Sequence, residues 1–397
     1  MVPWVAVMVR VGFILEGHTW LGGLNYYRSL ISAIMQSPKS LIQPILFVAT
    51  KTPEEVIGNF RGVEIIRTKC LDAGSFFGLF RRTVRKLFGQ RDYVLEWVLL
   101  LHKIKILSHY SGELPRGTSI KAIGWIPDFQ YIHLPDLFTK EDSILRKEAV
   151  DRVVRNSKVV ILSSEAAQRD LAVVAPKSVA NSRVLRFVPM VDLQDAQVGT
   201  ARYVECKYDL VSPYFYLPNQ FWVHKNHVIV INALAIMKSQ GIKTTVVASG
   251  AISDHRFPEH YAALMAAVTQ EGLSDAFIVL GVVPYADLIS LIRGSLALIN
   301  PSLFEGWSTT VEEAKALDKL VLLSDIPVHR EQNPKKGIFF DPRNPEELAK
   351  IMRGVVTSRT QELDANYESS YSQSYEEDRI KFAQCYADVV AHALSTE

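Results

Sequence analysis

The chain reads N-P-S-L-F-E-G-W-S-T-T-V-E-E from Asn300 to Glu313, directly after the apolar run Ser295–Ile299. The apolar run predicts a buried parallel strand, and the Ser/Thr-rich residues after it predict the start of a helix. A strand–loop–helix turn places backbone N–H groups and the positive end of a helix dipole where an anion can bind. The stretch therefore predicts an anion site at the helix-start amides near Ser308, flanked by Glu305 and Glu313.

The glutamates of the helix start also have a structural interpretation. Thr309 with Glu312, or Thr310 with Glu313, fits a capping box, in which the glutamate only satisfies helix-start amides. A capping box leaves Glu305 unexplained, because this residue precedes the helix and stands beside a glycine. Two carboxylates around a phosphate site suit recognition of hydroxyls on both sides of a diphosphate. This arrangement predicts a nucleotide sugar as the ligand.

The segment from Pro301 to Glu331 resembles the E-x7-E region of retaining GT-B glycosyltransferases of family 4. The likeness continues through Gly337–Pro342 and Pro345–Leu348. It implies an α/β fold of the GT-B type, with two Rossmann-like domains facing across a cleft and a C-terminal helix that crosses back to the first domain. It also implies that Glu313 holds the ribose hydroxyls and that Glu305 orients the donor sugar as a catalytic residue. The other donor-binding residues implied in this stretch are Gly306, Trp307, Ser308 and Thr309.

The segment Leu217–His227 carries a second part of the resemblance. Family members usually show G-R-x4-K here, with the Arg and Lys holding the donor diphosphate, and Lys225 stands at the lysine position. Lys225 is therefore a catalytic and donor-binding candidate, with Asn219 and Gln220 beside it in the donor site. Gln220 stands where the arginine is expected, so either one charge is missing or an arginine from elsewhere supplies it. Asn226 is predicted to cap the next helix.

Two further loops resemble ligand-contacting loops of the family. Val282 and Val283 follow a predicted strand where relatives bind the base through backbone groups, and a simple strand-to-helix turn is the alternative. Gly22 and Gly23 open the first predicted helix, where glycines allow a ligand to approach the backbone closely. The alternative for this pair is a tight turn.

The segment Gly124–Pro135 ends a predicted strand and resembles a subgroup that reads I-P-D-x-Q-H-x-H-x-P. Asp128 and His133 keep two of these positions, and both are catalytic candidates; a structural histidine is the alternative for His133. The sequence contains no D-x-D and no His/Asp/Glu cluster with ligand spacing. We therefore expect no metal site, no cofactor, and neutralisation of the leaving diphosphate by Lys225, a helix dipole and amides.

The length of 397 residues indicates two domains. Short β-rich runs alternate with helical ones, which predicts doubly wound parallel sheets, and the pattern lapses around 189–203. We predict an acceptor-side domain at 1–195, a nucleotide-sugar domain at 196–375 and a crossover helix at 376–397. The predicted strands are Val5–Ile14, Ile45–Ala49, Lys103–Ser108, Ala122–Ile126, Val159–Leu162, Arg183–Val188, Tyr214–Leu217, Thr244–Ala248, Ile278–Gly281, Leu296–Ile299 and Val321–Leu323.

Bulk composition favours a cytoplasmic protein. Three widely spaced cysteines fit neither a disulfide framework nor a zinc site, no run is long enough to span a membrane, and a net charge of +2 gives no case for nucleic acid. Residues 76–91 combine bulky apolar and basic side chains, as interfacial helices do, which would associate the protein with the inner face of the plasma membrane. An ordinary surface helix is the alternative.

The resemblance implies retaining, metal-independent transfer of a sugar from a nucleotide sugar to the hydroxyl of a saccharide or lipid-linked acceptor. We expect a UDP-sugar, with UDP-glucose as the first candidate, and a role in bacterial polysaccharide or glycolipid assembly. Two alternatives stay open: a GT-B sugar-nucleotide 2-epimerase, which would work without an acceptor, and a non-catalytic sugar-nucleotide binder.

Overall fold

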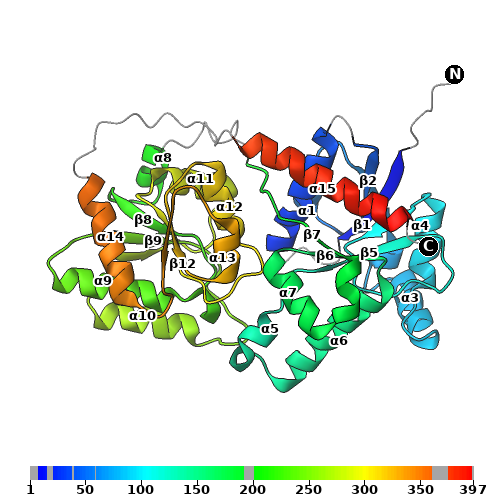
Figure 1. The fold of residues 1–397 in the computed structure, drawn as a ribbon, viewed down its shortest axis with the longest axis horizontal. Helices are drawn as coiled ribbons and strands as arrows, with labels where there is room; N and C mark the ends of the chain where they lie inside the picture. The colour runs from blue at the N-terminus through cyan, green and yellow to red at the C-terminus, as the bar shows by residue number, and fades with distance from the viewer. Residues whose placement is uncertain are drawn as a thin grey trace. The chain divides into compact units, whose positions relative to one another are not determined.

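The computed structural model describes residues 8–15, 21–37, 40–58, 60–191, 201–359 and 374–395. The chain divides into two compact units. Unit 1 comprises Met1–Tyr131, Thr139–Met190 and Glu376–Glu397, and unit 2 comprises Ile132–Phe138 and Val191–Tyr375. Each unit contains a parallel sheet with helices packed on it (Figure 1). The domain boundary that we predict at 195–196 lies outside the described residues.

Unit 1 is built on a seven-stranded parallel sheet with the strand order β3-β2-β1-β4-β5-β6-β7. Its inner strands are short apolar runs that are largely buried, as parallel strands between layers of helices must be, whereas the edge strands β3 and β7 are only partly buried. The strands are β1 (Val9–Leu15), β2 (Ile42–Ala49), β3 (Glu64–Thr68), β4 (Ile106–Ser108), β5 (Lys121–Ile126), β6 (Val159–Leu162) and β7 (Ser182–Val184).

The helices of unit 1 connect these strands, and the last helix of the chain joins them. In that helix the Tyr386 hydroxyl donates to Ser108 Oγ at 2.7 Å, so the C-terminal helix packs on the first unit as we predict. The helices are α1 (Leu21–Gln36), α2 (Glu54–Ile57), α3 (Phe76–Leu87), α4 (Tyr93–Leu101), α6 (Lys140–Asn156), α7 (Glu165–Val174) and α15 (Tyr375–Ser395), with the 3-10 turns η1 (Lys69–Leu71) and η3 (Pro176–Asn181). Helix α5 (Gln130–His133) and turn η2 (Pro135–Leu137) lie where the chain passes between the units.

Unit 2 is built on a six-stranded parallel sheet with the order β10-β9-β8-β11-β12-β13. Relative to the chain this is the 3-2-1-4-5-6 order of a Rossmann fold, whose direction of winding reverses between β8 and β11. Ligands of such sheets bind at this reversal, beyond the carboxyl ends of the strands. The strands are β8 (Tyr214–Leu217), β9 (Thr245–Ala248), β10 (Phe277–Val279), β11 (Leu298–Asn300), β12 (Val321–Ser324) and β13 (Gly337–Phe340).

The hydrophobic core of unit 2 lies between one face of its sheet and the helices that cover that face. Phe215, Met237 and Met352 are completely buried in this core, and they come from β8, α9 and α14. The helices of the unit are α8 (Ala201–Lys207), α9 (His227–Ser239), α10 (His260–Gln270), α11 (Tyr285–Gly294), α12 (Thr309–Ala316), α13 (Pro327–Gln332) and α14 (Pro345–Arg359), with the 3-10 turn η5 (Val223–Lys225).

Some predicted strand ends are wrong by a few residues. The strand predicted at Arg183–Val188 ends at Val184, because its partner β6 ends at Leu162, which pairs with Val184. The strand predicted at Ile278–Gly281 ends at Val279, and Gly281 adopts a φ of +68°, which leaves the extended conformation. The edge strand β3 was not predicted. Among the described residues, no helix has the length and apolar content needed to cross a bilayer.

Candidate functional site

Two loops of unit 2 meet where the winding of its sheet reverses. One loop follows β8 and carries Lys225, and the other follows β11 and carries Glu305. The Nζ of Lys225 lies 2.6 Å from Oε1 of Glu305, and both side chains are largely buried. Because β8 and β11 are neighbours in the sheet, residues 80 positions apart in sequence become a buried ion pair. Two of the predicted catalytic residues, Lys225 and Glu305, therefore lie in contact.

Hydrogen bonds hold Glu305 in its ionised form. Ser302 Oγ donates to Glu305 Oε1 at 2.7 Å, beside the bond from Lys225. Burial by itself would raise the pKa of Glu305, but the charge of Lys225 and these two hydrogen bonds hold the pKa below its ordinary value. The site therefore contains a fixed carboxylate at neutral pH.

The start of α12 differs from the predicted capping box. Ser308 is the N-cap, and its Oγ accepts from the Val311 amide, so neither threonine–glutamate pair caps the helix. The Ser308 amide donates to Oε1 of Gln332, whose amide group also donates to Glu312. A side chain therefore satisfies the Ser308 amide, and the anion site at the helix-start amides near Ser308 stays a prediction.

Glu313 lies on α12 with a polar atom that has no partner. Its carboxyl is buried, and Oε2 makes no hydrogen bond with any described residue. Burial raises the pKa of Glu313 to about 8, and a hydrogen bond with the Tyr285 side chain opposes that rise only in part. A buried unsatisfied carboxyl oxygen is unfavourable, so this atom is suited to receive a hydrogen bond from a ligand hydroxyl.

Two buried histidines, His224 and His329, lie beside the ion pair, and neither could be selected from sequence. His224 precedes Lys225, and its Nδ1 has no hydrogen-bond partner among the described residues. His329 on α13 contacts Ser324 through Nδ1, and its Nε2 has no described partner. Burial lowers the pKa of His224 to about 3 and that of His329 to about 4, so both rings are neutral near pH 7.

Arg256 is a second cation beside the loop that carries Lys225, largely but not fully buried, and it too was missed from sequence. Its Nε and Nη1 are buried and make no hydrogen bond with any described residue, although Nε lies 3.7 Å from Oδ1 of Asp254. The guanidinium carbon lies 4.8 Å from the ring centroid of Phe138 and 5.8 Å from that of Trp222. A buried guanidinium with free donors is suited to bind an anion. The position of Gln220 could have directed attention to arginines of the neighbouring loop.

A close approach and a hydrogen bond at two glycines connect the loops that follow β8, β9 and β10. Gly250 has a φ of +141°, and a Cβ there would lie 2.6 Å from the Asn219 carbonyl oxygen. Its amide donates to the carbonyl of Gly281, which precedes Val282 and Val283. Val282 is exposed and Val283 half-buried, while Asn219 is buried and Gln220 half-buried. These predicted donor-binding residues therefore lie in loops beyond the carboxyl ends of β8 and β10.

Asn226 plays a different part from the one we predict. It precedes α9 in the left-handed conformation, with a φ of 57°, and its side chain makes no capping bond. Instead Nδ2 donates to the carbonyls of Pro301 and Pro342. Asn226 therefore ties the Lys225 loop to the Glu305 loop.

Comparison with known proteins identifies the second half of the chain. The family model described as "Glycosyl transferases group 1" matches residues 212–371. These residues are a glycosyl transferases group 1 domain. They include Lys225, Arg256, Glu305 and Glu313.

Relatives of known structure share the fold over nearly the whole chain. A glycosyltransferase from Rickettsia africae has 15% sequence identity and a TM-score of 0.61, with 98% of this chain and 94% of that chain covered. Anabaena HepE, solved in complex with UDP and glucose, has 14% identity and a TM-score of 0.66, with 96% and 99% covered. The two parallel sheets and these relatives show that the chain has the GT-B fold.

A curated relative from Xenopus tropicalis, "Glycosyltransferase 1 domain-containing protein 1", is 34% identical over 77 residues. The match covers 19% of this chain and spans 22% of the length of that relative.

Unit 2 also includes Ile132–Phe138, a segment that precedes α6. His133 lies in this unit, and its ring stacks on Phe304 with centroids 5.2 Å apart, directly beside Glu305. Asp128 lies in unit 1, where its Oδ1 accepts from the Gln130 amide at the start of α5. Gly22 and Gly23 lie in the first turn of α1, also in unit 1.

Within the group 1 domain, Gly306 and Trp307 are half-buried in the loop between Glu305 and Ser308, and Thr309 begins α12. Within the described ranges, no group of three or more His, Cys, Asp or Glu side chains is arranged to hold a metal ion.

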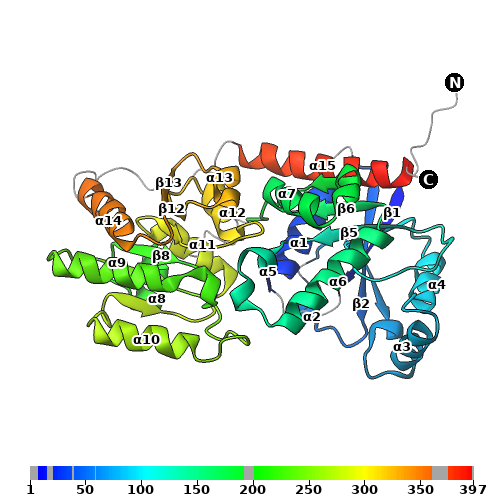
Figure 2. The same cartoon turned by 60° about the horizontal axis from the view of Figure 1, so that its bottom comes forward.

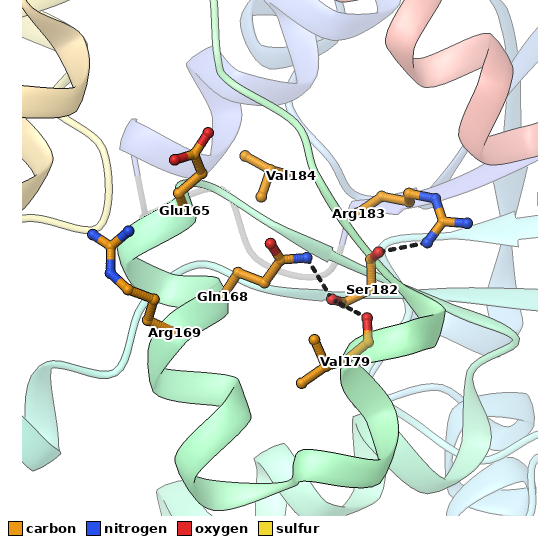
Figure 3. Close-up of a pocket in the computed structure, with 7 residues that line it drawn as sticks. All are labelled: Glu165, Gln168, Arg169, Val179, Ser182, Arg183 and Val184. Carbon is orange, nitrogen blue, oxygen red and sulfur yellow. Dashed lines mark hydrogen bonds between the residues drawn. The ribbon is translucent and has the colours of Figure 1, made fainter.

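A cavity of about 510 Å³ lies outside the group 1 domain, between α7, η3 and β7 of unit 1. Figure 3 shows that Gln168 bonds to Ser182, which in turn bonds to the carbonyl of Val179. Arg183 donates to the carbonyl of Ser182. The cavity contains none of the predicted site residues, and most of its polar groups bond to one another. We assign it no ligand.

Proposed function

We propose that this chain transfers a sugar from a nucleotide-sugar donor to an acceptor hydroxyl. The observation that carries the proposal is the buried Lys225–Glu305 pair at the reversal of winding in a glycosyl transferases group 1 domain. Around that pair lie buried polar atoms without partners, on His224, Arg256 and His329. Buried polar groups are rarely left unsatisfied, so these atoms indicate a site that is completed by a polar ligand.

Lys225 and Arg256 together supply the positive charge for the donor diphosphate. The resemblance places an arginine at the position of Gln220, and Arg256 supplies a guanidinium from the neighbouring loop instead. Both cations act on negative charge that grows on the leaving phosphate as the glycosidic bond breaks. Since two side chains neutralise that charge, we propose that transfer proceeds without a divalent ion.

The two glutamates take different roles. Glu305 is ionised, and it contacts and orients the donor sugar hydroxyls. Glu313 has a free Oε2 and receives hydrogen bonds from the ribose hydroxyls of the nucleotide. Around Glu313, Val282 and Val283 contact the base through their main chain. Lys225 moves from Glu305 toward the phosphate when the donor binds, because the diphosphate carries the greater negative charge.

The donor that we favour is a UDP-sugar, with UDP-glucose first. Anabaena HepE has the same fold and is described in complex with UDP and glucose, which supports this choice. The transfer retains the anomeric configuration, with the acceptor attacking the face from which the nucleotide leaves. The acceptor is a saccharide or a lipid-linked saccharide of bacterial polysaccharide or glycolipid assembly, used on the cytoplasmic side of the membrane. From the resemblance alone, we propose that Asp128 and His133 are catalytic residues and that Gly22 and Gly23 contact the donor.

The test is nucleotide release from a panel of UDP-, GDP- and ADP-sugars in excess EDTA without acceptor. We expect slow release of UDP from one donor, with water as a poor acceptor, and loss of that release in Lys225→Ala. Analysis of the sugar in the remaining sugar nucleotide distinguishes a transferase from a 2-epimerase, because a 2-epimerase would convert that sugar without an acceptor. If no nucleotide is released and calorimetry detects no binding of UDP, GDP or ADP, the proposed function is wrong.

A further inference from the structure

Helix α3 exposes its apolar face to solvent. Phe76, Phe80 and Leu87 recur at spacings of four and seven residues, which places them on one face of a helix. Phe76 is 77% exposed and Leu87 is 75% exposed. The residues buried on the opposite side are Gly78 and Arg81. An ordinary surface helix has the reverse arrangement, with its apolar stripe toward the core.

The inverted orientation is fixed by specific contacts. Arg81 Nη2 lies 2.7 Å from Oδ2 of Asp92, and Asp92 is completely buried. A Cβ at Gly78 would lie 1.9 Å from the carbonyl oxygen of Asp72, so only glycine allows the helix to approach this closely. Ser75 caps the helix by accepting from the Gly78 amide. The helix therefore cannot rotate its phenylalanines inward without breaking a buried ion pair.

Helix α4 extends the same apolar surface. Trp97, Leu100 and Leu101 are exposed on one side of α4, whereas Leu95 and Leu99 on the other side are completely buried. Phe88 after α3 and Tyr93 of α4 make a ring contact with centroids 5.2 Å apart. Figures 1 and 2 both show α3 and α4 side by side at one end of unit 1.

The apolar side chains of this surface form a concentrated patch. Ten of the 26 exposed large apolar side chains among the described residues lie between positions 76 and 101. An exposed patch of this kind marks a surface that binds something. We call it the α3–α4 face, and its members are Phe76, Phe77, Leu79, Phe80, Leu87, Phe88, Tyr93, Trp97, Leu100 and Leu101.

The charged side chains exposed on α3 have one sign, and α4 adds one half-buried acidic residue, Glu96. Arg82 and Lys86 are exposed on α3, and residues 76–91 contain no acidic side chain. Asp92 follows directly, but it is buried against Arg81 and cannot offset these cations at the surface. Protein interfaces are depleted in lysine, whereas Phe, Leu and Trp next to Lys and Arg are typical of helices that lie in a lipid headgroup region.

We infer that the α3–α4 face docks on an anionic lipid bilayer. The phenylalanines, leucines and Trp97 would enter the boundary between headgroups and acyl chains, while Arg82 and Lys86 would contact anionic headgroups. The inference goes beyond the proposed sugar transfer and does not depend on it. It gives the protein a place at the membrane surface, where a lipid-linked acceptor would be found.

Co-sedimentation of the full chain with vesicles tests this inference. We expect at least tenfold tighter binding to vesicles of phosphatidylglycerol and phosphatidylcholine than to vesicles of phosphatidylcholine alone, with weaker binding at high salt. The triple variant Phe76→Ser, Phe80→Ser and Leu87→Ser should lose at least tenfold in affinity for the anionic vesicles. The variant Arg82→Gln, Lys86→Gln should lose roughly twenty-five-fold in affinity, since each cation contributes about fivefold.

A matched triple variant controls for loss of apolar surface in general. Ile144, Leu145 and Val173 are also exposed in unit 1, and their replacement by serine should leave vesicle binding unchanged. Thermal unfolding of each variant shows whether the fold persists. The inference is overturned if the unmodified chain does not bind anionic vesicles, or if both triple variants lose binding equally. It is also overturned if light scattering finds a dimer that the α3 triple variant converts to monomer, because a second copy would then cover the face.

Discussion

The Nζ of Lys225 lies 2.6 Å from Oε1 of Glu305, and the two residues follow the neighbouring strands β8 and β11. Each side chain therefore neutralises the other in the absence of a ligand. A bound diphosphate would compete with Glu305 for Lys225, so the ion pair with Glu305 weakens the attraction of Lys225 for phosphate. Removing one partner of a buried pair leaves the other without compensation, which costs about 3–5 kcal/mol.

The first prediction separates the roles of these two residues. Glu305→Gln keeps the shape of the side chain and frees Lys225, so UDP should bind at least as tightly as before. Turnover should fall at least a hundredfold, because the carboxylate no longer orients the sugar. Lys225→Ala should weaken UDP binding at least tenfold. Calorimetry with UDP and single-donor turnover measure the two effects separately.

The control for this pair is an exposed ion pair in the same unit. Lys336 and Asp318 lie 2.6 Å apart at the surface, and Lys336→Ala should change neither UDP binding nor turnover. If Glu305→Gln abolishes UDP binding, Glu305 holds the nucleotide rather than the sugar, and our assignment of roles is wrong.

The second prediction concerns Arg256 and Gln220. Arg256→Ala should lower turnover by about tenfold to a hundredfold, because one cation beside the leaving phosphate is lost. Adding Gln220→Arg to that variant should restore much of the turnover, since it returns a guanidinium to the position where the resemblance places one. Steady-state kinetics of the single and double variants measure the rescue.

Arg343 provides the matched control for Arg256, because it is an exposed arginine of the same unit. Arg343→Ala should leave turnover unchanged. An Arg256→Ala variant that unfolds at a lower temperature but keeps its turnover would show that the arginine only supports Phe138 and Trp222 through ring contacts.

The sequence was sufficient for the GT-B fold and for the residues of the site that follow strands. Lys225 and Glu305 could be selected because they stand at positions of the family resemblance in loops that follow predicted strands, and strand order explains why they meet. His224, His329 and Arg256 could not be selected in the same way, because their importance depends on burial and missing partners. Periodicity gives no information on either property. The exposed face of α3 could be read from sequence only as one of two possibilities, since a helix with both apolar and basic residues can turn either side to the core.

The third prediction uses the raised pKa of Glu313. Burial raises this pKa from an ordinary 4.5 to about 8 in the folded protein, so the folded state favours the protonated carboxyl. The stabilisation from protonation is fully present below pH 4.5 and is lost as the pH rises to about 8. Glu313→Gln cannot ionise, so its unfolding temperature should rise relative to the unmodified protein across this window and stay level above it. Thermal unfolding at intervals from pH 4.5 to pH 9 measures the difference. If the unfolding temperatures of the two proteins change with pH in parallel, the pKa of Glu313 is not raised by burial.

The fourth prediction concerns Gly250, whose φ of +141° strains any residue with a Cβ. Gly250→Ala would also place that Cβ 2.6 Å from the Asn219 carbonyl oxygen. Strain and overlap together should destabilise unit 2 by about 2–4 kcal/mol and lower its unfolding temperature by about 5–10 °C. UDP binding should weaken as well, since the displaced carbonyl lies in the loop that carries Lys225.

Gly354 is the matched control for Gly250. It lies inside α14 with nothing within 4 Å of the position of a Cβ. Gly354→Ala should raise stability by up to about 1 kcal/mol, because alanine is the better helix former. Calorimetric unfolding and UDP titration of both variants would measure the two effects. If Gly250→Ala binds UDP as the unmodified protein does despite a lower unfolding temperature, the loop after β9 supports the fold without positioning the donor site.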